Sequence, residues 1–114
     1  MSGCIFCKIA SGEIPAEIVH RDDLCVAFRD INPAAPQHIL LIPVEHIPSM
    51  NSVAKDHAAL LGHMMTVLPG IAEKAGVAES GYRTVINCNS DAGQEVFHLH
   101  IHLLGGRKLA WPPG

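Results

Sequence analysis

Three histidines, His98, His100 and His102, stand at every second position of an apolar segment near the end of this 114-residue chain. In a β-strand, alternate side chains point to the same face, so the imidazoles would line one side and the intervening leucine and isoleucine side chains the other. In an α-helix, the same positions would advance by about 100° each and spread around half of the cylinder. The spacing therefore predicts a strand over residues 98–104, with neighbouring imidazoles about 6.5–7 Å apart.

Three imidazoles among apolar residues are costly to bury, which indicates that they have a chemical use. A neutral imidazole is a good nucleophile near pH 7, and its N-phosphoryl adduct stays reactive. His100, in the middle, is placed to attack, with a histidine on either side to bind a phosphate or pass protons. Two alternatives are weaker. A solvated face would mix Lys, Glu and Thr, and a three-histidine metal centre would need widely spaced rings to reach one ion.

A pair of cysteines, Cys4 and Cys7, poses a second question at the start of the chain. A C-x-x-C pair can supply two of the four ligands of a tetrahedral zinc site, form a redox couple, or remain as two inert, half-buried thiols. The first residues lack the basic region and long apolar core of a secretory signal, so we expect reduced thiols or metal ligands in a cytoplasmic protein. Cys25 and Cys88 fall in predicted strands and are expected to be core residues.

The composition indicates one domain over residues 1–114 that has apolar surface to spare. Hydrophobic residues make up 48% of the chain and charged residues only 17%, a balance that favours oligomerisation. The net charge is −3 and the only basic run lies at residues 106–108, so a nucleic-acid or anionic membrane surface is not expected as a partner. No segment approaches the roughly 20 apolar residues that a membrane span needs.

Short elements without repeats must position these side chains. Apolar leucines and methionines at i, i+4 spacing predict a long helix over residues 52–75, with a kink or break at Pro69. Three histidines, His20, His57 and His63, are expected to be surface or half-buried residues without a role. The other predicted elements are a short helix over 4–11, a hairpin of strands over 17–22 and 24–29, and strands over 38–44, 82–88 and 98–104, five antiparallel strands in all.

The triad segment resembles the His-φ-His-φ-His-φ-φ motif of the histidine-triad (HIT) superfamily, and its surroundings resemble the Hint branch of that family. The resemblance implies an α+β fold: a five-stranded antiparallel sheet with one main helix and a short N-terminal helix, joined in a homodimer as a ten-stranded sheet. It also implies hydrolysis of purine nucleoside 5′-phosphoramidates, such as adenosine phosphoramidate or lysyl-adenylate, to a nucleotide and an amine. The segments that carry it are 27–31, 35–38, 82–87, 93–107 and 111–114.

By resemblance, catalysis proceeds through a nucleotidyl-His100 intermediate that water then cleaves. His102 and His38 would polarise the non-bridging phosphate oxygens, and no cofactor is needed for this chemistry. Asp30 resembles the carboxylate that accepts from the ribose hydroxyls, although an Asp there can also form a turn before the following Asn-Pro pair. Trp111, in the Trp-Pro-Pro-Gly tail, resembles the residue that shapes the leaving-group site across the dimer; a tail loose in solvent is the alternative.

The remaining nucleotide-binding positions also rest on the resemblance. Glu95 departs from it, because other Hint members have a hydroxyl residue there that donates to the phosphate. A carboxylate cannot donate unless protonated, so we expect Glu95 to point away and contribute only its backbone N–H. The positions that match the apolar slot for the base are Ile5, Phe6, Ile9, Phe28 and Ile31. The positions that match the phosphate site are Asn87, Gly93, Glu95 and Val96.

The resemblance also suggests partners for the two cysteines. In HIT relatives that keep Cys4 and Cys7, the remaining zinc ligands match His46 and His98 here. The implied site is a structural Cys2His2 zinc that ties the N-terminal turn to the catalytic segment. Many Hint proteins lack the cysteines and work without metal, in which case His46 and His98 would join a proton relay. Two other functions stay open: hydrolysis of dinucleoside polyphosphates or nucleotidyl transfer, and nucleotide-dependent regulation with little turnover.

Overall fold

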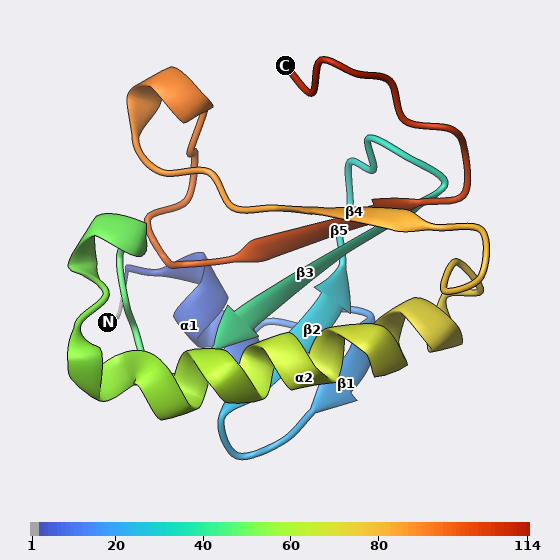
Figure 1. The fold of residues 1–114 in the computed structure, drawn as a ribbon. Coiled ribbons are helices and arrows are strands. Elements are labelled where there is room, and N and C mark those ends of the chain that lie inside the picture. The colour runs from blue at the N-terminus through green and yellow to red at the C-terminus, as the bar shows by residue number, and fades with distance from the viewer. Residues whose placement is uncertain (1–2) are drawn as a thin grey trace.

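A computed structural model describes residues 3–114 of the chain. One five-stranded antiparallel sheet, in the order β1-β2-β3-β5-β4, forms its centre. The predicted α+β class, with one main helix and a short N-terminal helix, is confirmed (Figure 1). The elements are α1 (Ile5–Ala10), β1 (Ile18–Arg21), β2 (Cys25–Arg29), β3 (Gln37–Pro43), α2 (Ala58–Lys74), β4 (Tyr82–Val85) and β5 (Ile101–Gly105), with single 3-10 turns at Met50–Ser52, Lys55–His57 and Ser90–Ala92.

The two faces of the sheet bury different parts of the chain, as strand alternation requires. Ile39 and Leu41 of β3 pack with Met64 of α2 on one face. Leu40 and Ile42, on the other face of β3, pack with α1. The sheet therefore separates the main helix from the face on which the N-terminal helix lies (Figure 1).

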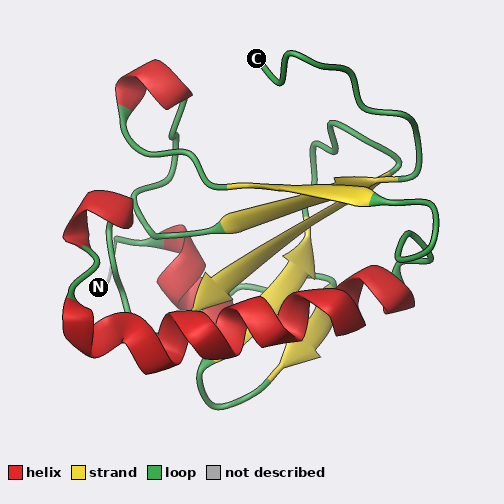
Figure 2. Ribbon diagram, viewed as in Figure 1, coloured by secondary structure: helices red, strands yellow, loops and turns green. Residues whose placement is uncertain are grey.

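The strand predicted over residues 98–104 is shorter than expected, because β5 begins only at Ile101. The three residues before it run alongside the bend that follows β3, where Leu99 N–H donates to the Ile47 carbonyl at 2.6 Å. The ladder between β3 and β5 ends at the Leu41–Ile101 pair, although β3 runs on to Pro43. Pro43 has no N–H, and its carbonyl accepts from the ring of His98, so it forms no ladder bond with residues 98–100, which are drawn as loop in Figure 2. Side chains still alternate there: Leu99 is buried in the interior, and the histidines point away from α2.

The long helix also differs from its prediction at both of its critical points. Residues 50–57 form two 3-10 turns, and α2 proper begins at Ala58. The predicted break at Pro69 does not occur, because α2 continues through Pro69 to Lys74. Burial of Leu68 and Ile71 against the sheet holds the helix on both sides of the proline.

Two smaller predictions meet different outcomes. Cys25 is fully buried in the core between the sheet and α2, as expected. Cys88 is not in a strand, because β4 ends at Val85, and it is only half-buried.

The C-terminal tail leaves 79% of Trp111 exposed, and the ring of Trp111 lies 5.8 Å from the Arg83 guanidinium. Within residues 3–114, none of the helices has the length and apolar character to cross a membrane.

Candidate active site

Strands β3 and β5, with the segment just before β5, bring three imidazoles together, which we call the histidine array: His38, His100 and His102. Leu40 pairs with His102 across the ladder, and His38 lies two residues before Leu40, so His38 and His102 share one face. His38 Nε2 lies 2.9 Å from His102 Nδ1, and the rings of His100 and His102 are 4.9 Å apart. His38 and His100 are buried, so their ring nitrogens need hydrogen-bond partners within the protein.

A backbone hydrogen bond fixes the tautomer of His100. Its Nδ1 lies 2.7 Å from the carbonyl oxygen of His98, and a carbonyl only accepts, so Nδ1 must carry the hydrogen. In the neutral ring, Nε2 then keeps its lone pair and is the nucleophilic nitrogen. The ring of Phe6 packs edge-on against His100 with centroids 5.1 Å apart, which restricts its rotation.

A second run of hydrogen bonds fixes the tautomers of His38 and His102. Ala34 N–H donates to His38 Nδ1 at 3.0 Å, so in the neutral ring the hydrogen of His38 is on Nε2. That Nε2–H donates to Nδ1 of His102, which leaves the Nε2 of His102 as a donor. Asp30 stands beside this pair, with its Oδ2 3.6 Å from His38 Nε2.

Burial favours the neutral form of two members of the array, His38 and His102. Burial, with the neighbouring His100 and His38 rings, lowers the pKa of His102 to about 4. Burial also lowers the pKa of His38, an effect that the Asp30 carboxylate partly offsets. Neutral imidazoles at pH 7 can act as nucleophile and as hydrogen-bond donor in one site.

Two adjoining cavities open over this face of the sheet. The apolar cavity, about 420 Å³, is lined by all five residues predicted for the base slot. The histidine cavity, about 410 Å³, is lined by the histidine array together with Asn87 and Gly93. Five residues line both cavities and so connect them: Phe6, Asp30, Leu40, Glu95 and Val96.

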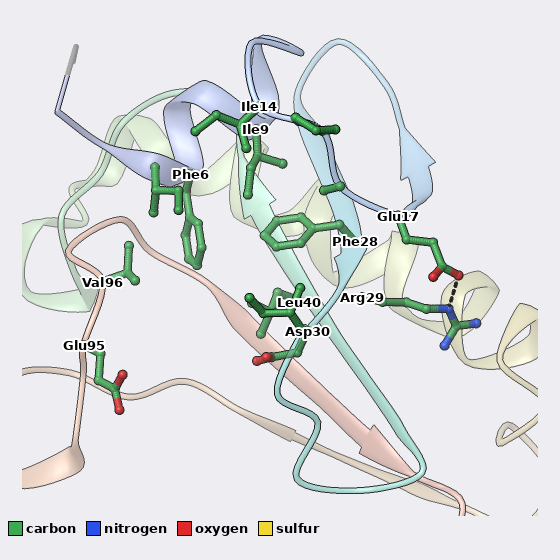
Figure 3. Close-up of a pocket in the computed structure, with 14 residues that line it drawn as sticks. Phe6, Ile9, Ile14, Glu17, Phe28, Arg29, Asp30, Leu40, Glu95 and Val96 are labelled. Carbon is green, nitrogen blue, oxygen red and sulfur yellow. Dashed lines mark ion pairs between the residues drawn. The ribbon is translucent and has the colours of Figure 1, made fainter.

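The apolar cavity has an aromatic end and an acidic end. Figure 3 shows Phe6 and Phe28 pointing into it from α1 and β2, and their rings meet edge to face with centroids 5.5 Å apart. The Asp30 carboxylate lies toward the other end, beside Leu40 (Figure 3). A ligand with a planar apolar group at one end and a hydrogen-bond donor next to it fits the aromatic end and the acidic end of this cavity.

Some lining residues carried no signal in the sequence, and some predicted ones are peripheral. Ile14 and Leu40 line the apolar cavity, although one follows a turn and the other reads as an ordinary strand residue. Ile31 lies at its rim and is 92% exposed. Trp111 lines neither cavity.

Glu95 lies at the rim of both cavities with an exposed side chain. Its carboxylate is turned away from the aromatic end of the apolar cavity (Figure 3). Residues 3–114 supply it with no ion-pair partner. Any contribution of its backbone N–H to phosphate binding stays a prediction.

Next to the histidine array lies the cysteine–histidine cluster: Cys4, Cys7, His46 and His98. One ligand atom from each of these residues falls within 4.8 Å of all the others. The Nδ1 atoms of His46 and His98 are 3.2 Å apart, and the sulfur–nitrogen distances from Cys4 and Cys7 are 3.3–3.5 Å. Tetrahedral zinc, with bonds of about 2.0–2.3 Å, places its ligands roughly 3.3–3.8 Å apart, so this donor set fits zinc.

A second bond orients His98 for such a site. Its Nε2 lies 2.8 Å from the Pro43 carbonyl and must donate, so Nδ1 is left unprotonated toward the sulfurs. Burial lowers the pKa of His98, which favours the neutral ring that binds metal. The ring of His98 does not line the histidine cavity; it is the carbonyl of His98 that contacts His100.

Comparison with known proteins identifies the class that this fold and site define. A family model described as the HIT domain matches residues 11–109, so the chain belongs to the HIT family. Over 105 residues the chain is 56% identical to the purine nucleoside phosphoramidase of Escherichia coli K12, a match that covers 92% of this chain and 88% of that protein. An uncharacterised HIT-like protein of Synechococcus elongatus is 57% identical, with 96% of both chains covered.

Solved structures agree with this assignment. A HIT family hydrolase from Legionella pneumophila has a TM-score of 0.96 at 52% identity, covering 98% of this chain and all of the other. A histidine triad protein from Clostridium difficile has a TM-score of 0.93 at 45% identity, with 96% of each chain covered. The predicted family is confirmed.

Proposed function

We propose that this protein hydrolyses purine nucleoside 5′-phosphoramidates to a nucleoside monophosphate and an amine. The observation that carries the proposal is His100, whose Nδ1–H is held by the His98 carbonyl so that Nε2 is free as a nucleophile. It lines a cavity that adjoins an apolar slot with a carboxylate at one end. The name of the relative from Escherichia coli supports the same reaction.

In this proposal the nucleotide lies across both cavities. The base enters the apolar cavity beside Phe6 and Phe28, and the ribose hydroxyls donate to the Asp30 carboxylate. The phosphate then falls in the histidine cavity, near Nε2 of His100 and the Nε2–H of His102. Asn87, Gly93, Val96 and the backbone of Glu95 complete the phosphate site.

The reaction has two displacement steps at phosphorus. In the first, Nε2 of His100 attacks, a P–N bond to His100 forms, and the P–N bond to the substrate amine breaks. The amine must leave protonated, and a neutral His102 cannot supply that proton without becoming an anion, so the proton comes from solvent and is returned to solvent when water reacts in the second step. The Nε2–H of His102, oriented by the hydrogen-bond run from Ala34, donates to a non-bridging phosphate oxygen. In the second step, water attacks the nucleotidyl-His100, its bond to phosphorus breaks, and the nucleoside monophosphate leaves.

We further propose that the cysteine–histidine cluster binds a structural zinc ion. Zinc would cross-link the start of α1 to the bend after β3 and to His98, without taking part in the displacement steps. The carbonyl of His98 orients His100, so zinc would keep that carbonyl in place. A homodimer, in which Trp111 of one chain reaches the leaving-group side of the other, completes the proposal.

Trapping the intermediate tests this function. Protein mixed with adenosine 5′-phosphoramidate and quenched within its first turnovers is expected to gain the mass of one adenylyl group, on His100. The His100→Ala variant should gain none, while His57→Gln, which alters a histidine outside both cavities, should gain as much as the wild type. An adduct that persists in His100→Ala would contradict the proposed nucleophile. Binding of AMP with no adduct and no turnover would replace the enzyme with a nucleotide-binding protein.

A further inference from the structure

Another group of metal-binding side chains lies where the hairpin turn meets the main helix, on the α2 side of the sheet. We call it the hairpin cluster: His20 of β1, Asp22 of the turn, Cys25 of β2 and His63 of α2. Asp22 Oδ2 is the common contact, 2.6 Å from His20 Nε2, 2.8 Å from His63 Nε2 and 3.5 Å from Cys25 Sγ. None of these residues lines either cavity of the active site.

The local backbone explains why these side chains converge. Asp22 Oδ1 accepts from the backbone N–H groups of Leu24 and Cys25 at 2.8 and 3.0 Å, so the carboxylate is held with Oδ2 facing the histidines. The strand register shifts between Ile18 and His20, a bulge that turns His20 toward the α2 side. The turn is thus built to present one carboxylate oxygen, as second-shell bonds do for metal ligands.

The donor set suits a divalent transition metal. Ligand atoms of His20, Asp22 and Cys25 all lie within 4.8 Å of one another, whereas His63 lies outside that set and contacts only the Asp22 oxygen. Both histidine nitrogens are at hydrogen-bond distance from that oxygen, so binding would have to widen these separations to the roughly 3.3–3.8 Å of a tetrahedral zinc site and draw His63 inward. Two imidazoles, a carboxylate and a thiolate are all accepted ligands of tetrahedral zinc. Their combined charge of −2 would neutralise the ion, which matters because Cys25 is fully buried.

Without a metal, the same atoms form a hydrogen-bonded group. Although burial opposes it, the hydrogen bonds from His20 and His63 lower the pKa of Asp22, and burial beside Asp22 raises the pKa of the Cys25 thiol to about 12. Binding would move each histidine hydrogen from Nε2 to Nδ1 and release the Cys25 proton to water. His20, Asp22 and His63 are only half-buried, so an ion can reach them from solvent.

We propose that the hairpin cluster is a second zinc site, independent of the cysteine–histidine cluster. It would join the β1–β2 hairpin to α2, two elements that are otherwise connected through apolar packing and the Lys74 ammonium, which donates to the Val19 carbonyl.

Metal counting on the full chain tests this second site. Wild type, His20→Gln, His63→Gln and Cys25→Ala are equilibrated at the same buffered free zinc concentration, with His57→Gln as the matched control. His57 is also a half-buried histidine paired with a carboxylate, Glu45, but it lies outside the cluster. Each of the three cluster variants is expected to hold one zinc ion fewer per chain than His57→Gln, with affinity at this site lowered by at least about tenfold.

The difference in count does not depend on whether the cysteine–histidine cluster is loaded, because that cluster is intact in every variant. Circular dichroism in EDTA establishes that each variant is folded. Counts equal to the control in the cluster variants would overturn the proposal, including the case in which they melt earlier in EDTA. That result would assign the hairpin cluster to hydrogen bonding alone. A count lowered equally in His57→Gln would also overturn it, because the loss would then be non-specific.

Discussion

His100 and His102 are prepared for opposite tasks by their hydrogen-bond partners rather than by their own chemistry. The His98 carbonyl accepts a hydrogen bond from Nδ1–H of His100, which leaves Nε2 as the nucleophile. The run from Ala34 through His38 places the Nε2–H of His38 against Nδ1 of His102, so Nδ1 accepts and the hydrogen of His102 is on Nε2. Two neighbouring copies of one residue type thereby become a nucleophile and a donor.

The half-buried, neutral state of His102 predicts an acid-sensitive fold. Its pKa is lowered to about 4 in the folded chain from an ordinary value of 6.5, so between these values the unfolded chain binds more protons. The free energy of unfolding should therefore fall as the pH drops through this window, by about 1–2 kcal/mol between pH 7 and pH 5 from this group. Urea unfolding at both pH values measures it. His102→Gln should lose less stability than wild type; an equal loss would show that His102 is not responsible.

The proposed ribose contact of Asp30 predicts a discrimination between nucleotides. Asp30→Asn keeps the shape and the acceptor for the Asn32 N–H, which Asp30 Oδ1 now accepts at 2.8 Å. It removes the charge, so affinity for AMP should fall about tenfold, or about 1.4 kcal/mol. Calorimetry with AMP and 2′-deoxy-AMP separates ribose contacts from general effects. Wild type should prefer AMP, and Asp30→Asn should lose most of that preference; an unchanged preference would place the ribose elsewhere.

The sequence predicted most of the side chains that gather at the candidate site, but not the contacts between them. Spacing and family resemblance placed His38, His100 and His102 in one site, and all of them line the histidine cavity. The tautomers depend on backbone groups at residues 34 and 98, and no pattern of side chains encodes those contacts. His20 and His63 meet only because a bulge and a helix register bring residues 43 positions apart to one carboxylate, so their convergence on Asp22 was missed.

At the scale of elements, the predictions were right wherever a pattern of apolar residues was long and wrong at its ends. The hairpin, the apolar third strand and the long helix are all present. Residues 98–100 share the alternating pattern of β5 without belonging to it, because side-chain alternation requires an extended backbone but not a ladder partner. Pro69 by itself predicts that the helix ends or kinks there, but α2 continues through it because the neighbouring residues are buried against the sheet.

The first residue before the short helix α1 allows a test of how zinc affects the stability of the fold. Cys4 is its N-cap, and its Sγ accepts from Cys7 N–H at 3.4 Å. Serine also caps helices well, so Cys4→Ser keeps this role and removes a soft metal ligand. Compared with Cys88→Ser, Cys4→Ser should hold one zinc ion fewer per chain and lose the zinc-dependent gain in stability, about 2.7 kcal/mol at a hundredfold excess over Kd.

Zinc analysis and thermal melts with and without EDTA provide the measurement for α1. Equal zinc counts and equal response to EDTA in Cys4→Ser and Cys88→Ser would remove zinc from the cysteine–histidine cluster. The His98 carbonyl that orients His100 would then be held by the neighbouring contacts of His98 with Pro43 and of Leu99 with Ile47.

At the scale of the whole molecule, the sheet is open at β4, an edge strand with apolar side chains exposed around it. Tyr82 begins this strand and Ile86 follows it, and both are partly exposed, as is Met65 of α2 at 56%. The proposed dimer would cover this surface and extend the sheet from five strands to ten. It would also bring the exposed Trp111 of one chain within reach of its partner.

Solution mass tests the dimer. We expect the wild type to have twice the mass of the 12.2 kDa chain by light scattering, because the exposed apolar surface is removed from water. Met65→Glu should shift the equilibrium toward monomer by at least about tenfold, whereas Thr66→Glu, one residue away and also exposed, should not. A wild type that is monomeric at all concentrations would contradict the dimer, and equal effects of the two substitutions would place the interface elsewhere.

The proposed role of His100 is to carry out phosphoramidate hydrolysis without help from a metal. Its most direct test is steady-state hydrolysis of adenosine 5′-phosphoramidate by wild type and His100→Ala, each with and without EDTA. We predict that the substitution lowers kcat by about a thousandfold or more, and that EDTA changes wild-type turnover little while the protein stays folded. Turnover that survives in His100→Ala, or that EDTA abolishes in folded wild type, would contradict this role of His100.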